Sequence, residues 1–212
     1  MEDPLLRLRR RLAGPLPGLD AQLALAPRPR FGWNPDALPD GLRPAAALVL
    51  VYPHDGAAHL PLTVRGGTLR THTGQVSLPG GAVDPGETLE EAALREAAEE
   101  VGVDPSTVDV LGRLTPLHIP VSGFLLHPIV AVTATRPSFR PHTLEVARLL
   151  EVPLAHLAHP ATVRHEIRQL RRGGALHDVE VPYFDVDGEK VWGATAMVLA
   201  ELLALIAPPA MP

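Results

Sequence analysis

Five glutamates lie between residues 90 and 100, in the stretch LEEAALREAAEEV. At about 100° per residue of an α-helix, Glu96, Glu99 and Glu100 fall within an arc of roughly 100°. Arg95 is the only basic residue of the stretch, whereas a solvated helix face normally carries a base four residues from each acid. Carboxylate oxygens gathered in this way suit a hard divalent cation such as Mg²⁺ or Mn²⁺. The helix alone leaves two interpretations open, a metal site and a solvated acidic face.

The residues around this helix favour the metal site and mark the ends of the helix. The preceding loop, LPGGAVDPGE, contains Gly80 and Gly81, and consecutive glycines let the backbone approach a bound group closely. Thr88 begins the capping-box spacing T-x-x-E, and Gly102 stands where a left-handed C-terminal cap belongs. These signals predict a helix over roughly Leu89–Val101.

The same residues match a known signature. Gly81, Glu87 and the run from Arg95 to Val103 follow the spacing G-x5-E-x7-R-E-U-x-E-E-x-G-U, in which U is apolar. The chain therefore resembles the Nudix hydrolase family. This resemblance implies an enzyme that hydrolyses a nucleoside diphosphate linked to another moiety. It also implies an α+β fold, a Nudix-type α/β/α sandwich with a mixed sheet between helices.

The resemblance implies a set of metal ligands. By similarity, Glu96, Glu99 and Glu100 bind the divalent ions, Mg²⁺ or Mn²⁺. The carbonyl group of Gly80 or Gly81 is expected to supply a further ligand.

Other residues of the signature are expected to have structural roles. By the same resemblance, Glu87 and Arg95 form an ion pair that braces the loop against the helix. Gly81 and Gly102 belong to the same structural set, in the loop and at the end of the helix.

The resemblance leaves the general base open. Glu99 and Glu100 are candidates within the signature, because a carboxylate beside the metals can accept a proton or orient water. Nudix enzymes often use a glutamate outside the signature instead. Glu145 is our candidate there, since it opens a mostly apolar segment, and Glu151 and Glu166 are weaker alternatives.

The residues upstream of the glycines resemble a second, more selective signature. The stretch LPLTVRGGTLRTHTGQVSLPGG is similar to LLTxR[SA]xxxRxxxGxxxFPGG, the signature of coenzyme A pyrophosphatases. Pro61, Gly66 and Leu78 depart from it. The matching positions are Leu62, Thr63, Arg65, Arg70, Gly74, Pro79, Gly80 and Gly81.

This second resemblance implies a substrate. It implies hydrolysis of the diphosphate bridge of coenzyme A to 3′,5′-ADP and 4′-phosphopantetheine. The thiol end lies away from the cut, so acyl or oxidised forms are further candidate substrates. Coenzyme A carries an additional 3′-phosphate, and Arg65 and Arg70 are candidates to contact phosphate groups, with His72 as a third.

Two alternatives to this substrate assignment stay open. One is a Nudix hydrolase that acts on ADP-ribose, NADH or another nucleoside diphosphate derivative. Some ADP-ribose enzymes carry a proline near the positions of Pro116 and Pro120, so this cue is ambiguous. The other is a non-catalytic nucleotide-binding Nudix module, which would usually lack some of the acids that are all present here.

Composition narrows the class of protein and partner. The chain has 212 residues, no cysteine and a net charge of −5. The absence of cysteine excludes disulfides and thiolate metal sites. Net charge argues against a nucleic-acid polymer, and no apolar run is long enough to span a membrane. We therefore expect a cytoplasmic enzyme with a small-molecule substrate, whose oligomeric state is open.

The expected elements place these motifs in a mixed order of elements, mostly strands with two long helices. We expect residues 1–44 to form an N-terminal helix and a proline-rich, irregular lead-in, followed by a Nudix domain at 45–207. A helix is expected over Trp192–Ile206, and Glu145–Leu154 is ambiguous between strand and helix. The expected strands are Ala46–Tyr52, His59–Arg65, Val108–Leu114, Leu125–Thr133, Val163–Leu170 and Val179–Phe184.

Overall fold

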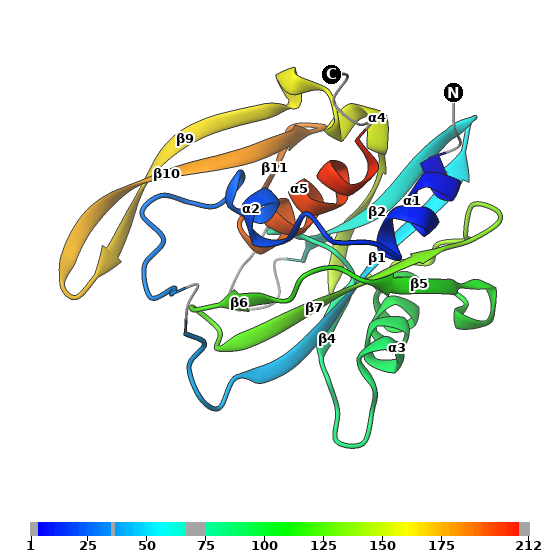
Figure 1. Cartoon of the computed structure of the whole chain (residues 1–212), viewed down its shortest axis with the longest axis horizontal. Helices are drawn as coiled ribbons and strands as arrows, with labels where there is room; N and C mark the ends of the chain where they lie inside the picture. Colours follow the sequence, from blue (N-terminus) through cyan, green and yellow to red (C-terminus); the bar gives the residue numbers. More distant parts are fainter. Residues whose placement is uncertain (1–3, 35–36, 67–74, 208–212) are drawn as a thin grey trace.

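A mixed sheet with helices on both faces organises the chain (Figure 1). The computed structural model describes residues 4–34, 37–66 and 75–207. Eight strands of the described chain form this sheet, in which β1 and β7 run parallel and the other pairs are antiparallel. The expected α+β fold is confirmed. The strands are β1 (Arg43–His54), β2 (Ala57–Arg65), β3 (Val76–Ser77), β4 (Gly80–Ala82), β5 (Asp109–Arg113), β6 (Leu117–Ile119), β7 (Phe124–Val132) and β8 (Val146–Pro153).

One face of the sheet is covered by α3 (Leu89–Val101), the helix that carries the glutamates. Its buried side chains are mostly alanines, and these small residues let the helix lie close to β1. The Thr88 side chain accepts a hydrogen bond from the Glu91 amide at 3.2 Å, and Gly102 ends the helix with a φ of 71°. The predicted helix boundaries are confirmed. The short helix η1 (Pro105–Thr107) follows.

The other face is covered by α5 (Ala194–Ile206), against which α1 (Pro4–Leu12) and α2 (Gly18–Leu23) pack (Figure 1). Leu8 of α1 is buried, and the side chains of Arg7 and Arg11 donate to carbonyl groups at the end of α5. The lead-in that was expected to be irregular contains a second helix, because α2 lies within it. Its position depends on α5, a contact that no local sequence pattern reveals.

Glu201 of α5 holds α2 in place. This fully buried carboxylate accepts hydrogen bonds from the Gly18 amide at 3.2 Å and the Gln22 side chain at 2.8 Å. It also accepts from the amide and the hydroxyl group of Thr115, the latter at 2.7 Å. The lead-in is therefore fastened to the terminal helix and to the segment before β6.

A second sheet extends from the body as a long hairpin (Figure 1). It contains β9 (Val163–Arg172), β10 (Ala175–Val186) and β11 (Glu189–Trp192). The expected strands Val163–Leu170 and Val179–Phe184 are confirmed as β9 and β10, and both are longer than expected. The segment left ambiguous becomes β8, followed by α4 (Leu154–Leu157) and η2 (Pro160–Thr162). No helix in the described part of the chain is both long and apolar enough to span a membrane.

Candidate active site

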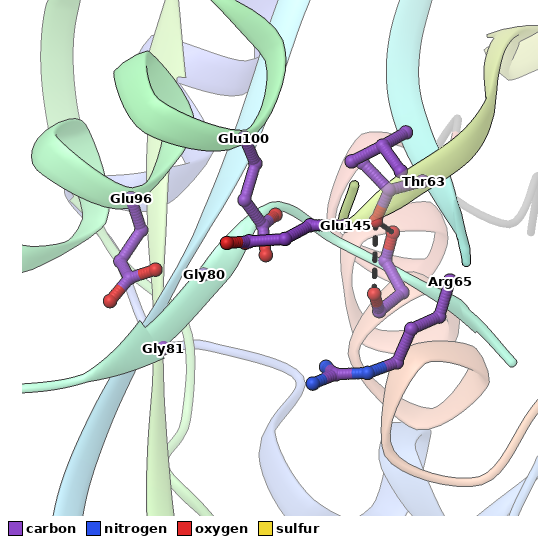
Figure 2. Close-up of a pocket in the computed structure, with 9 residues that line it drawn as sticks. Thr63, Arg65, Gly80, Gly81, Glu96, Glu100 and Glu145 are labelled. Atoms are coloured by element: carbon purple, nitrogen blue, oxygen red, sulfur yellow. Dashed lines mark hydrogen bonds between the residues drawn. The ribbon is translucent and has the colours of Figure 1, made fainter. Parts of the chain in front are cut away.

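A cavity of about 190 Å³ opens where α3 faces the ends of β2, β3 and β4 (Figure 2). Its lining residues bring carboxylates, glycines, hydroxyl groups, one guanidinium and one valine to the cavity. The lining residues are Thr63, Arg65, Ser77, Gly80, Gly81, Glu96, Glu100, Glu145 and Val146.

The structure brings together residues from three separate stretches of the sequence. Glu96 and Glu100 come from α3, Arg65 ends β2, and Glu145 precedes β8. Gly80 and Gly81 line the same cavity from β4. Some of the residues predicted as metal ligands and phosphate contacts thus share one cavity with the predicted outside base, Glu145.

Glu99, by contrast, does not line this cavity. Its side chain is 61% exposed, and its Oε2 atom lies 3.3 Å from Nη1 of Arg95. Helical spacing predicts that Glu99 lies on the same side of the helix as Glu96 and Glu100. In the structure its carboxylate instead points toward Arg95. Arg70 and His72 lie outside the described residues.

The two weaker candidates for the general base are engaged elsewhere. Glu151 accepts hydrogen bonds from Tyr52 and Arg136, and Arg136 holds the pKa of Glu151 below its usual range. Glu166 pairs with Lys190 and Arg168 on the second sheet. Neither glutamate lines the cavity.

Backbone hydrogen bonds hold Glu145 beside α3. The amide of His142 donates to the carbonyl of Glu100 at 2.8 Å, and the amide of Glu145 donates to the carbonyl of His142 at 2.9 Å. The amide of Gly66 in turn donates to the carbonyl of Glu145 at 2.8 Å. The segment before β8 is therefore tied to the end of α3 and to the end of β2.

Arg95 connects the glycine loop with the helix. Its guanidinium donates to both carboxylate oxygens of Glu87, at 2.9 and 3.1 Å, and to Glu96 at 2.9 Å. It also donates to the carbonyl of Ala82 at 3.2 Å. These contacts lower the pKa of Glu87 and orient Glu96 next to the cavity.

The two glycines have no room for a side chain. A Cβ atom on Gly80 would come 2.6 Å from Cα of Ala47, and one on Gly81 would collide with the carboxylate of Glu96. The backbone of β4 therefore lies close against β1 at Gly80 and against the carboxylate of Glu96 at Gly81.

The charges of the cavity suit a cation. Burial, followed by the charge of Glu96, raises the pKa of Glu100 to about 7, and Glu145 acts in the same direction. Oxygen Oε2 of Glu100 is buried and has no hydrogen-bond partner. Buried carboxylate oxygens normally have a partner, and a hard cation would supply one. Three carboxylates and one guanidinium line the cavity, so the residues present fit a divalent ion.

The carboxylates are not gathered tightly around one point. Among the described residues, no group of three or more acidic or histidine side chains has the spacing that would already enclose an ion. Glu96 is paired with Arg95, and Glu99 is turned away. The fit to a divalent ion therefore rests on the acidic lining of the cavity and on the unpartnered oxygen of Glu100. It does not rest on a complete set of ligands already in place.

Replacing Gly81 by Ala is expected to weaken Mn²⁺ binding by about tenfold or more. The new methyl group would displace the carboxylate of Glu96, while Gly81 does not have the positive φ that would make alanine strained. Electron paramagnetic resonance of added Mn²⁺ measures the affinity, and a thermal melt checks that the fold is kept. Gly14→Ala, at a glycine with ordinary space around it, is the matched control. Unchanged Mn²⁺ affinity in Gly81→Ala would contradict a role for Glu96 in metal binding.

Sequence reasoning assigned no role to the hydroxyl groups of the cavity. Thr63 matches the upstream signature, and Ser77 occupies one of its undefined positions. The two residues lie directly opposite each other on β2 and β3. The hairpin register was the signal that could have identified them, but β3 is too short for a periodic pattern.

Comparison with known proteins gives one consistent result. The family model described as NUDIX domain matches residues 41–171. The uncharacterized Nudix hydrolase NudL of Pectobacterium atrosepticum is 40% identical over 172 residues, covering 78% of this chain and 86% of that protein. A protein of the same name from Escherichia coli is 39% identical, covering 76% of this chain and 81% of that protein. The solved structure of RenU, a Nudix hydrolase from M. smegmatis, is 29% identical and covers 56% of this chain and 77% of that chain, with a TM-score of 0.47.

Proposed function

The chain belongs to the Nudix family, and from this premise we propose that it hydrolyses the diphosphate bridge of coenzyme A. The products would be 3′,5′-ADP and 4′-phosphopantetheine, with acyl or oxidised coenzyme A as further substrates. Nudix hydrolases generally use divalent cations such as Mg²⁺ or Mn²⁺. The finer assignment rests on the upstream signature and on where its residues lie.

One observation carries the proposal. Arg65, which belongs to the upstream signature, lines the same cavity as Glu96, Glu100 and Glu145. Its guanidinium makes no ion pair with another described residue, so its charge is available to a phosphate group. A diphosphate bound between this cation and the carboxylate wall would have both charge neutralisation and a place for metals.

In this proposal each side chain has a defined task. Glu96 and Glu100 hold the divalent cation, with the carbonyl of Gly80 as a further ligand. The bound cation would screen the negative charge of the diphosphate and polarise its phosphorus. Glu145 orients the attacking water and accepts its proton, since it lines the cavity beside Glu100. Arg65 binds a phosphate oxygen and stabilises the charge that develops as the bridge breaks.

Parallel assays of coenzyme A, ADP-ribose and NADH test the substrate assignment. We expect kcat/KM for coenzyme A to exceed the other two by at least about tenfold, since a site built to pair a substrate group discriminates against analogues that lack it. Mass spectrometry of products made in H₂¹⁸O identifies the bond that is cut and the phosphorus that is attacked. Equal or faster hydrolysis of ADP-ribose would overturn the assignment to coenzyme A, and binding without turnover would favour a non-catalytic module.

A further inference from the structure

Two hydroxyl groups lie in the wall of the cavity, and none of the roles above uses them. Thr63 and Ser77 are paired across β2 and β3, and both residues line the cavity. Oγ1 of Thr63 lies 3.0 Å from Oγ of Ser77 and 3.3 Å from the Ser77 carbonyl oxygen. Thr63 is only 3% exposed, so its hydroxyl group is held within the protein.

The number of hydroxyl hydrogens determines what this pair can offer. Thr63 has one, and the oxygens of Ser77 are its recorded partners. When Thr63 donates to the hydroxyl oxygen of Ser77, rather than to its carbonyl oxygen, the hydroxyl hydrogen of Ser77 has no partner that it must keep. Because Ser77 is only half-buried and lines the cavity, its hydrogen can then be directed to a bound group. In this arrangement the pair presents one donor to the cavity.

This donor stands on the basic side of the cavity. Figure 2 shows Thr63 and Arg65 on one side and Glu96 and Glu100 on the other. An oxyanion and a metal ion need opposite surroundings, donors for the former and carboxylates for the latter. A diphosphate with its cation would meet both requirements in this cavity.

We propose that the Ser77 hydroxyl group, oriented by Thr63, donates a hydrogen bond to a non-bridging oxygen of the substrate diphosphate. Ser77 is then a substrate-binding residue, and Thr63 is a positioning residue that acts through it. The inference rests on the proposed function in so far as it assumes a diphosphate in this cavity. It does not depend on which moiety is attached to that diphosphate.

A hydrogen bond to a charged oxygen sets the expected size of the effect. Loss of such a bond typically lowers affinity or kcat/KM by about 10- to 100-fold. Ser77→Ala should therefore weaken binding of methylenediphosphonate, whose P–C–P bridge is not hydrolysed, by about tenfold in the presence of Mg²⁺. Isothermal titration calorimetry measures this affinity without any turnover.

Variants of Thr63 test the positioning role. Thr63→Val keeps the shape of the side chain but removes the hydroxyl group, so it should weaken binding in the same direction as Ser77→Ala. Thr63→Ser keeps the hydroxyl group and should bind as the wild type does. Ser122→Ala, at an exposed serine on the turn after β6, is the control and should leave affinity unchanged.

The result also separates this inference from the proposed function. Unchanged methylenediphosphonate affinity in Ser77→Ala would overturn the inference, even if the wild type hydrolyses coenzyme A. Wild-type affinity in Thr63→Val would overturn the positioning role, because the hydroxyl group of Thr63 would then be dispensable. An equal loss in Thr63→Ser, which keeps that hydroxyl group, would overturn it as well, because the packing of the side chain would then account for the effect. Failure of the wild type to hydrolyse coenzyme A, with the binding losses intact, would refute the proposed substrate alone. Thermal melts and Mn²⁺ titrations of each variant establish that the fold and the metal site are kept.

Discussion

Glu100→Gln is expected to lower kcat by at least about 1000-fold with any diphosphate substrate that the wild type hydrolyses. The buried, unpartnered oxygen of Glu100 is the cavity atom best suited to hold a divalent cation. Glutamine removes the negative charge and keeps the shape of the side chain. Steady-state kinetics with saturating Mg²⁺ measures the loss, and Mn²⁺ resonance should report weaker binding in the same variant.

Stability measured without metal shows whether such a loss comes from misfolding. Burial and the charges of Glu96 and Glu145 raise the pKa of Glu100 to about 7. The backbone of Gly80 and the charge of Arg65 act in the opposite direction. A carboxyl group with a raised folded pKa destabilises the protein increasingly as pH rises from its unfolded value, near 4.5, through 7. Metal-free Glu100→Gln should therefore unfold at the same or a higher temperature than the wild type at pH 8.

A second glutamate of α3 supplies the matched control. Glu90 forms an ion pair with Arg113 and does not line the cavity, so Glu90→Gln should keep kcat within about threefold. Retention of more than a tenth of wild-type kcat in Glu100→Gln would contradict the metal assignment. Comparable losses in both variants would indicate that charge on the helix matters generally, rather than at the cavity.

The elements that sequence predicted best are those specified by local interactions. The boundaries of α3 depend on Thr88 and Glu91 at its start and on Gly102 at its end. These residues lie within or next to the helix, so a single sequence is enough to place its ends. The short strands β3 and β4 were not predicted, because two or three residues give no periodicity. Helix α2 was also missed, since its anchor is Glu201, more than 170 positions away in the chain.

The same distinction holds for the candidate site. Signature spacing identified Glu96 and Glu100, and the hypothesis of an outside glutamate named Glu145, all of which line the cavity. Spacing could not determine that Glu99 turns toward Arg95, because a helical arc fixes the direction of Cβ but not the rotamer. The hydroxyl group of Ser77 comes to the site through the pairing of β2 with β3, which the sequence did not predict. The catalytic roles of Glu96, Glu100, Glu145 and Ser77 are predictions.

Glu201→Ala is expected to lower the free energy of unfolding by about 3 kcal/mol. The carboxylate is 0% exposed and makes no ion pair with a described residue, yet it accepts hydrogen bonds from Gly18, Gln22 and Thr115. Alanine would take the acceptor from the half-buried Gly18 amide and Thr115 hydroxyl group, and it would leave the buried Gln22 side chain only the carbonyl of Thr115. For a chain of this size the melting temperature should fall by roughly 6–12 °C, which calorimetry or fluorescence measures directly.

The contrast with an exposed glutamate shows what this buried carboxylate does. Glu189 pairs with Arg148 near the surface, so Glu189→Ala should change stability by less than about 1 kcal/mol. Glu201→Gln keeps one acceptor oxygen but turns an amide toward the donors of Gln22 and Thr115, so an intermediate loss is expected. Wild-type melting of Glu201→Ala would contradict a stabilising role of this carboxylate. A large loss would instead show that the carboxylate, which joins the lead-in and Thr115 to α5, stabilises the fold that carries the cavity.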